Sequence, residues 1–342
     1  MKTRSVLITG GLGFIGSHFI HRFRQNHPED HIVLLDKNTY AANIDRISLL
    51  KGQEGFTYVE ADIALPNIVD QIFAQYQPEI VINFAAESHV DNSINGPALF
   101  LETNVRGTFN LLESARKLWM EHPQQLKQGF HNARFFQIST DEVFGSLGSQ
   151  GFFNEHSNYA PNSPYSASKA AADHWVRSYY HTYKLPTLLS HCSNNYGPFQ
   201  HDEKLIPTII RTALKGEPIP IYGDGKNIRD WLFVEDHCEA IEQILSSAPP
   251  GETYTIGGNS ERTNLDICMT IIQELDKQRP RRDSESYEKQ ITFVADRLGH
   301  DFRYAISADK IKKELNWTPQ FTFEEGLKKT IVHYLEKYRQ LT

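Results

Sequence analysis

The feature that most constrains the fold is a glycine-rich stretch near the start of the chain, TGGLGFIG, at residues 9–16. An apolar run at residues 6–8 precedes it, and a helical pattern follows at residues 14–23. Gly10 permits a tight turn, Gly13 lets the backbone approach a diphosphate, and Gly16 lets helix and strand pack closely. The stretch therefore predicts a strand, a phosphate-binding turn and a helix in succession.

Alternating apolar and helical segments continue along the first half of the chain. Further apolar runs stand at residues 32–35, 56–59, 80–84, 134–138 and 188–189. Helical patterns lie between them at residues 66–76, 97–120 and 164–184. This alternation is typical of parallel strands covered by helices on both faces. With right-handed crossovers it predicts an α/β protein with a Rossmann-type, doubly wound parallel sheet.

The amino-acid composition changes after about residue 193, where glycine and proline become frequent. Short apolar pieces at residues 219–222 and 254–256 alternate with helical patterns near residues 205–215, 236–247 and 264–276. We expect residues 1–192 to form the Rossmann domain that carries the catalytic residues. Residues 193–342 should form mainly a smaller C-terminal α/β lobe that binds substrate, with some exchange of chain between the two.

Composition excludes several classes of partner. The net charge of −7 leaves no basic surplus for binding nucleic acid. No apolar run approaches the ~20 residues that span a bilayer, and the N-terminus has no apolar signal segment. The three cysteines are scattered, which fits a reducing cytoplasm. The fifteen histidines form no metal-ligand spacing, so no metal site is predicted.

An acidic residue, Asp36, ends the second apolar run, 20 positions after Gly16. A carboxylate at this place accepts hydrogen bonds from a ribose diol and repels a 2′-phosphate, so the sequence favours NAD over NADP. The alternative is a purely structural turn, with Asp36 capping a helix. Asp62 and Ile63 follow the third run and would lie near the adenine, although an aspartate there often only caps a helix.

Tyr165 and Lys169 are spaced i and i+4, so on a helix both side chains lie on one face. A nearby ammonium favours the phenolate and should lower the tyrosine pKa from ~10 toward neutrality. The tyrosine would then be a general base for an alcohol that loses hydride. Pro164 suits a helix start. Without other context, such a pair would more often lie in solvent.

Two adjacent acids, Asp141 and Glu142, follow the apolar run at residues 134–138. The carboxyl ends of parallel strands are where α/β sheets bind ligands. Two partly buried acids this close do not both ionise easily. One neutral acid and one carboxylate form an acid/base pair that can eliminate water. The pair therefore indicates oxidation coupled to dehydration.

The glycine turn, Tyr165, Lys169 and Thr140 together resemble the extended short-chain dehydrogenase/reductase superfamily. Longer stretches are similar to the dTDP-glucose 4,6-dehydratase family over nearly the whole chain. These are ISTDEVFG (138–145), FAAESHVDNSI (84–94), SPYSASKAAAD (163–173), CSNNYGP (192–198), EKLIP (203–207), IYGDGKNIRDWLFVEDH (221–237), YTIGG (254–258) and DRLGHDFRYAI (296–306). The sequence departs from the family at Phe144, where Tyr is frequent, and at Asn92, where Arg is frequent.

The resemblance implies a role for each catalytic candidate. Tyr165 takes the proton of the sugar 4-hydroxyl while hydride leaves C4 for NAD⁺, and Thr140 holds that oxygen. Lys169 tunes Tyr165 and binds the nicotinamide ribose. Glu142 removes the C5 proton, Asp141 protonates the departing 6-hydroxyl, and hydride returns to C6. The product is a 4-keto-6-deoxy sugar nucleotide, and tightly bound NAD is regenerated in each turnover.

The resemblance also implies two sets of binding residues. The cofactor set is Gly10, Gly13, Phe14, Ile15, Gly16, Asp36, Lys37, Asn38, Thr39, Asp62, Ile63, Ala85, Ala86, Ser88, Thr103, Tyr165, Lys169 and Asn195. The substrate set is Ser88, Thr140, Asn194, Lys204, Leu205, Ile221, Tyr222, Arg229, Asn264, Arg297, His300 and Tyr304. Arginine suits a diphosphate because its planar fork donates two bonds at once. A surface ion pair is the alternative for each arginine.

Other functions remain open from the residues alone. A 4-epimerase would keep Thr140, Tyr165 and Lys169 but would not need the two acids. A dehydratase for another nucleotide sugar, such as GDP-mannose, should have the glutamate without the adjacent aspartate. A non-enzymatic NAD sensor should lack one of the catalytic candidates. If the protein has the activity that the family resemblance implies, its ketone product would feed deoxysugar biosynthesis, for example that of rhamnose.

The helical patterns at residues 97–120 and 164–184 carry long apolar faces that include Trp119 and Trp175. The family resemblance implies that these helices pair in a homodimer as a four-helix arrangement. Burial inside a monomer would give the same pattern, so both possibilities stand.

Overall fold

The computed structural model describes residues 3–296 and 300–340. In this part of the chain, seven strands form one parallel sheet in the order β12-β8-β7-β4-β1-β2-β3. The strands are β1 (Ser5–Thr9), β2 (His31–Asp36), β3 (Phe56–Glu60), β4 (Ile80–Asn83), β7 (Arg134–Thr140), β8 (Thr187–Cys192) and β12 (Thr253–Ile256). The predicted Rossmann-type sheet is confirmed.

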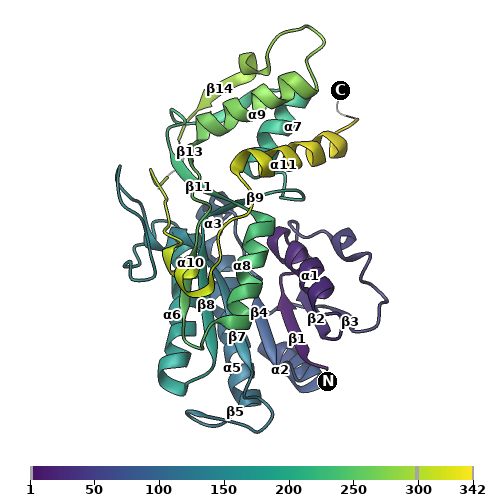
Figure 1. Ribbon diagram of the computed structural model, residues 1–342, viewed down its shortest axis with the longest axis vertical. Coiled ribbons are helices and arrows are strands. Elements are labelled where there is room, and N and C mark those ends of the chain that lie inside the picture. Colours follow the sequence, from purple (N-terminus) through teal and green to yellow (C-terminus); the bar gives the residue numbers. More distant parts are fainter. Residues whose placement is uncertain (1–2, 297–299, 341–342) are drawn as a thin grey trace.

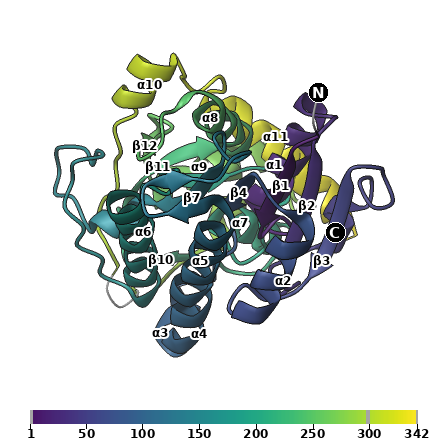
Figure 2. The same ribbon diagram turned by 90° about the horizontal axis from the view of Figure 1, so that it is seen from below.

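Helices cover both faces of this sheet (Figures 1 and 2). Apolar side chains of α1 and α8 pack on one face, and those of α2, α5 and α6 pack on the other. Their bounds are α1 (Phe14–Asn26), α8 (Val234–Ser247), α2 (Pro66–Tyr76), α5 (Thr108–Trp119) and α6 (Pro164–Tyr183). Since both faces are buried, the strands are continuous apolar runs; Val6, Leu7 and Ile8 are fully buried.

A smaller lobe lies above the carboxyl ends of the sheet, at the top of Figure 1. Its helices and strands pack around a second apolar core. They are β9 (Asn194–Tyr196), α7 (Leu205–Lys215), β10 (Ile219–Tyr222), β11 (Ile228–Phe233), β13 (Glu261–Thr263), α9 (Asn264–Gln278), β14 (Ile291–Val294) and α11 (Phe323–Lys337). Short elements complete the described chain: η1 (Ile44–Ile47), α3 (Val90–Asn95), α4 (Pro97–Phe100), η2 (Leu101–Gly107), β5 (Met120–His122), β6 (Gln125–Leu126), η3 (Asp141–Phe144), η4 (Tyr287–Gln290) and α10 (Asp309–Leu315).

Two local expectations differ from the structure. The predicted continuous helix at residues 97–120 is divided, because the π-helical turn η2 separates α4 from α5. Residues 254–256 were expected in the smaller lobe, but β12 pairs with β8 at the edge of the large sheet. A short apolar run does not specify which strand it will pair with.

No helix within the described ranges is long and apolar enough to cross a membrane. The two tryptophans of the predicted dimer helices differ in exposure. Trp119 is fully buried and donates to the carbonyl of Pro78 (2.7 Å), whereas Trp175 is 42% exposed and packs edge-on against Phe109.

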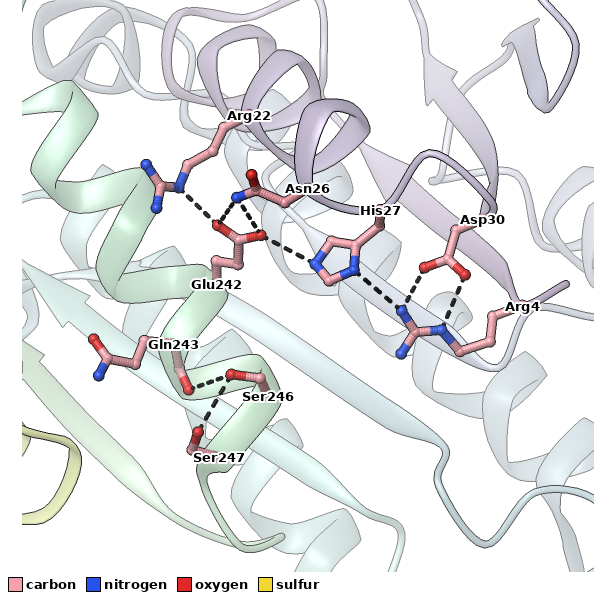
Figure 3. Close-up of polar contacts among 9 residues, drawn as sticks. All are labelled: Arg4, Arg22, Asn26, His27, Asp30, Glu242, Gln243, Ser246 and Ser247. Atoms are coloured by element: carbon pink, nitrogen blue, oxygen red, sulfur yellow. Dashed lines mark hydrogen bonds and ion pairs between the residues drawn. The ribbon is translucent and has the colours of Figure 1, made fainter. Parts of the chain in front are cut away.

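A polar cluster fastens α8 to α1 (Figure 3). The Glu242 carboxylate on α8 accepts hydrogen bonds from Arg22 Nε (2.7 Å), Asn26 Nδ2 (2.8 and 2.9 Å) and His27 Nε2 (3.0 Å). Because a carboxylate only accepts, Nε2 of His27 carries the proton. Nδ1 of His27 then faces Nη2 of Arg4 at 3.5 Å as an acceptor. One acid thus joins segments more than 200 residues apart in the sequence.

We expect Glu242→Ala to lower the free energy of unfolding by about 1–3 kcal/mol, because three donors lose a charged acceptor. Urea denaturation measures this change. Glu274→Ala is the matched control, since Glu274 accepts a bond from Gln278 of its own exposed helix surface and should change stability by less than ~0.5 kcal/mol. Equal effects of the two substitutions would contradict a docking role for Glu242.

Candidate active site

A cleft runs across the carboxyl ends of the central strands, beneath the smaller lobe. This is where doubly wound sheets bind ligands. The side chains and backbone that line it are those of Gly10, Gly13, Phe14, Ile15, Gly16, Leu35, Asp36, Lys37, Thr39, Ala41, Ala42, Ala61, Asp62, Ile63, Phe84, Ala85, Ala86, Glu87, Ser88, Thr103, Ile138, Ser139, Thr140, Asp141, Glu142, Tyr165, Lys169, Cys192, Ser193, Asn194, Asn195, Gln200, His201, Glu203 and Lys204.

The glycine turn at the floor of the cleft requires glycine for steric reasons. Gly10 has φ +71°, and a Cβ there would lie 2.5 Å from the backbone nitrogen of Ala85. A Cβ on Gly16 would lie 2.5 Å from the carbonyl oxygen of Gly10. A Cβ on Gly13 would meet only that same carbonyl, at 3.2 Å, and would otherwise occupy the cleft. The turn before α1 therefore fits a close-approaching diphosphate.

Asp36 lies at the end of β2 and supports the same turn. Its Oδ2 accepts from the backbone nitrogen of Leu12 (2.9 Å), and its Oδ1 accepts from that of Asn38 (2.9 Å). Each carboxylate oxygen retains capacity for another bond, as a ribose diol requires. Burial raises the pKa of Asp36, although these two backbone bonds oppose the shift. The residues present fit an adenine dinucleotide without a 2′-phosphate.

Charged residues continue along this end of the cleft. The Lys37 ammonium lies 3.2 Å from Glu87, 3.7 Å from Asp62 and 3.0 Å from the hydroxyl of Thr103. Asp62 also accepts from the backbone nitrogen of Ala64 (2.8 Å) in the turn before α2, but the N-cap of α2 is Leu65, so Asp62 does not cap that helix. Glu87 was not among the predicted site residues.

The two adjacent acids begin a short 3₁₀ turn, η3, directly after β7. The hydroxyl of Thr140 accepts from the backbone nitrogen of Glu142 (3.3 Å) and donates to Oδ1 of Asp141 (3.3 Å). Oδ2 of Asp141 is buried and has no hydrogen-bond partner among the residues that the structure describes. Burial, and then the charges of Glu142 and Asp230, hold the pKa of Asp141 well above its usual range. The geometry therefore supports a neutral Asp141.

Tyr165 and Lys169 lie one turn apart on α6, whose start is fixed by a capping box between Ser163 and Ser166. The Lys169 ammonium donates to the carbonyl of Ile138 on β7 (2.7 Å). Both side chains are buried, and burial lowers the pKa of Lys169.

The expected lowering of the Tyr165 pKa is not found. Burial raises the pKa of Tyr165 well above 10, and the Glu142 carboxylate raises it further. Desolvation of the phenolate and a nearby negative charge outweigh the ammonium one turn away. The i, i+4 spacing indicated the positive charge of Lys169, but it could not indicate the burial of Tyr165 or the negative charge of Glu142.

The predicted substrate residues divide into two groups. Ser88, Thr140, Asn194 and Lys204 line the cleft. The others lie beyond the lining set: Leu205, Ile221, Tyr222, Arg229, Asn264, His300 and Tyr304. Asn38 of the cofactor set also lies beyond it. Arg297 falls outside the described residues.

Arg229 organises the smaller lobe above the acids. Its guanidinium donates to the carbonyls of Ile228 (2.8 Å) and Asp301 (2.9 Å) and stacks 4.4 Å from the ring of Tyr304. Its charge opposes the rise in the pKa of Asp141. Arg229 is thus near the acids, although two of its donors are taken up by backbone.

Sequence reasoning missed an acidic group at the mouth of the cleft. Glu203 lies 3.5 Å from His201 and 3.7 Å from His89. Burial opposes ionisation, but the hydrogen bond from His201 and the nearby charge of His89 hold the pKa of Glu203 below its usual range. The adjacent predicted residue, Lys204, was the signal that could have identified it.

Three further side chains were noted in the sequence. Phe144 packs against His191 (4.8 Å between ring centroids) and Tyr159 (5.4 Å), away from the lining set. Asn92 donates to the hydroxyl of Tyr40 (3.1 Å). Cys192 lines the cleft, and burial raises the pKa of its thiol to about 12, so it is held as a neutral thiol.

These features define a class: an α/β enzyme of the extended short-chain dehydrogenase/reductase type, with two acids added beside the tyrosine and lysine. A family model described as GDP-mannose 4,6 dehydratase matches residues 7–330. A dTDP-glucose 4,6-dehydratase of Xanthomonas campestris pv. campestris (strain B100) is 51% identical to the chain, covering 96% of this chain and 92% of its own length. The chain belongs to the dTDP-glucose 4,6-dehydratase family.

Solved structures agree with this assignment. The dTDP-glucose 4,6-dehydratase of Bacillus anthracis, in complex with NAD, is 40% identical and superposes with a TM-score of 0.85 over 99% of this chain and 100% of its own. The enzyme of the same name from Streptomyces venezuelae, also with NAD bound, is 37% identical and has a TM-score of 0.87 over 99% and 100% of the two chains.

We expect Asp141→Asn to stabilise the protein while it removes an acid. The folded state favours protonated Asp141, so ionisation destabilises the fold as the pH rises above about 4, the pKa of an unfolded aspartate. At neutral pH the melting temperature should rise by roughly 2–4 °C, and the gain over wild type should shrink toward acid pH. Differential scanning fluorimetry across pH measures both.

Asp70→Asn provides a control of opposite sign. The Ser114 hydroxyl and the Lys117 ammonium lower the pKa of Asp70, so its charge stabilises the fold at neutral pH. This substitution should lower the melting temperature. A fall in melting temperature with both substitutions would show that Asp141 is ionised in the folded protein.

Proposed function

We propose that this chain is a dTDP-glucose 4,6-dehydratase that converts dTDP-glucose to dTDP-4-keto-6-deoxyglucose and retains NAD through each turnover. The observation that carries the proposal is the buried carboxyl of Asp141, whose pKa is held well above its usual range, beside Glu142 in one cleft with Thr140, Tyr165 and Lys169. The family to which the chain belongs and the NAD-bound relatives support it.

NAD bound at the glycine turn supplies the acceptor for the C4 hydride and later returns that hydride to C6. Tyr165 takes the proton of the sugar 4-hydroxyl, and Thr140 holds the same oxygen by a hydrogen bond. Only the phenolate can accept that proton, so Tyr165 must be deprotonated for this step; burial and the Glu142 charge oppose its deprotonation, and the Lys169 ammonium one turn away favours it. Lys169 holds the nicotinamide ribose and donates to the carbonyl of Ile138; burial lowers its pKa, and the charge of Asp173 opposes that shift.

The two acids then perform the elimination. A ketone at C4 acidifies the C5 proton, and Glu142 removes that proton. Asp141 gives its own proton to the departing 6-hydroxyl, so water leaves. Burial supplies the neutral acid that this step needs, because a carboxylate cannot donate. Hydride return to C6 leaves an enolate, and C5 regains a proton from Glu142 or from solvent. Asp141 is then reprotonated, and Tyr165 releases the proton that it took from the 4-hydroxyl, so the net change is the loss of one water.

We expect purified protein, incubated with dTDP-glucose and no added cofactor, to yield a 4-keto product lighter by one water molecule, as seen by mass spectrometry. Glu142→Gln should lower kcat by about 10²-fold or more. Glu60→Gln is the matched control, because Glu60 ends β3, an edge strand of the same sheet, and lies outside the lining set. No product, even with added NAD, would contradict the proposal.

The same experiment separates the alternatives. A 4-epimer of unchanged mass would indicate a 4-epimerase and would mean that the two acids do not act in elimination. Turnover of GDP-mannose in preference to dTDP-glucose would indicate the activity by which the matching family model is described.

We propose further that the enzyme works as a homodimer in the cytoplasm, within deoxysugar biosynthesis such as that of rhamnose. Exposed apolar side chains on and near α5 and α6 support the dimer: Leu99 (50% exposed), Leu101 (57%) and Trp175 (42%). Three buried, unpaired cysteines fit a reducing compartment.

Light scattering should give a dimer for wild type and a monomer for Trp175→Glu, and an unchanged mass for this variant would contradict the α6 interface.

A further inference from the structure

Arg46 connects two segments of the chain, each of which has residues that line the cleft. It lies in η1, beyond the loop that follows Asp36. Its Nη1 donates to the carbonyl of Leu12 in the glycine turn (3.0 Å). Its Nη2 donates to the carbonyl of Phe199, 2.5 Å away, in the loop between β9 and α7. One guanidinium therefore spans the cofactor turn and a loop of the smaller lobe.

That loop, Gly197–Lys204, carries much of the smaller lobe's share of the cleft, and we call it the substrate loop. Its cleft-lining residues are Gln200, His201, Glu203 and Lys204. Their positions depend on a backbone that is locally strained, because Phe199 has φ +65° without being glycine. Such a conformation persists only where surrounding contacts hold it.

The contacts that hold the loop backbone come from helices α1 and α11. His18 of α1 bonds the carbonyl of Pro198 (2.9 Å), and the Tyr334 hydroxyl donates to the carbonyl of Gln200. Burial lowers the pKa of His18, so the neutral ring donates through Nε2. Arg46 holds the carbonyl of the strained residue itself. On the cleft side, the rings of Tyr40 and His201 meet edge to face at 5.6 Å.

The chemistry of Arg46 indicates a geometric role. No ion pair to Arg46 is found among the described residues, and burial lowers the pKa of its guanidinium. A partly buried cation is costly, and the charge of Asp202 offsets that cost only in part, so the two carbonyl contacts contribute to holding the guanidinium in place. The rigid planar fork of a guanidinium fixes the two carbonyls relative to each other more tightly than a flexible ammonium could.

We infer that Arg46 is a positioning residue that fixes the substrate loop relative to the glycine turn, and so couples the site for the nucleotide sugar to the site for NAD. This inference rests on the proposed function for the identity of the two ligands. The coupling is reciprocal, as linkage requires: weakening the bridge should weaken the retention of both ligands.

We expect Arg46→Gln to raise the KM for dTDP-glucose roughly tenfold, about 1.4 kcal/mol of lost binding, while kcat at saturating substrate and NAD stays within about threefold. The fraction of NAD that remains bound after gel filtration should fall. Arg46→Lys, which can reach one carbonyl at a time, should give an intermediate KM, and it serves as the second variant if Arg46→Gln does not fold.

Arg24→Gln is the matched control. The Arg24 guanidinium also donates to backbone carbonyls, those of Pro28 (2.9 Å), Asp30 (3.0 Å) and Gly55. None of these residues lines the cleft. It should lower the melting temperature without changing KM or NAD retention. If Arg46→Gln behaves like this control, Arg46 is only structural and the inference is overturned.

Wild-type turnover keeps this test separate from the proposed function. If wild type does not turn over dTDP-glucose, the proposed function fails. The inference about Arg46 is then decided by NAD retention alone, and retention equal to wild type in Arg46→Gln overturns it.

Discussion

Removal of water from the end of β7 is the constraint on which the chemistry of this protein depends. Desolvation raises the pKa of Asp141, raises that of Tyr165 and lowers that of Lys169. Each change favours the uncharged form of the group. For Asp141 the uncharged form is the one that can donate a proton to a leaving hydroxyl, whereas Tyr165 must lose its proton before it can act as a base. The seven-stranded sheet and the smaller lobe are what keep this region dry.

The rigidity of the site comes from the way α6 is fixed to β7. Lys169 binds the carbonyl of Ile138, and one turn later the buried carboxylate of Asp173 accepts from the hydroxyl of Ser139 (2.7 Å). The next residue of β7 is Thr140. The helix that carries Tyr165 is therefore fixed at two successive strand residues, immediately before the acids begin.

Much of the fold could be predicted from the sequence because its signals are local. The glycine turn, the apolar runs and the start of α6 at Pro164 each depend on neighbours in the chain. The strand partner of residues 254–256 and the break at η2 could not be predicted, since both depend on distant packing. The same reason explains the site: Glu203 and the raised pKa of Tyr165 depend on side chains brought together only by the fold.

The position of β12 has a consequence for how this protein can be made. Thr253–Ile256 completes the edge of the large sheet beside β8, although part of the smaller lobe, from β9 to β11, is encoded between them. A ribosome must release the chain well past residue 256 before the sheet can close, so the first half emerges with the edge of β8 unpaired. A fragment that ends at Cys192 would keep that edge exposed, as a template for aggregation. Genetic division of this enzyme into two independent halves is therefore blocked by the strand order of its sheet.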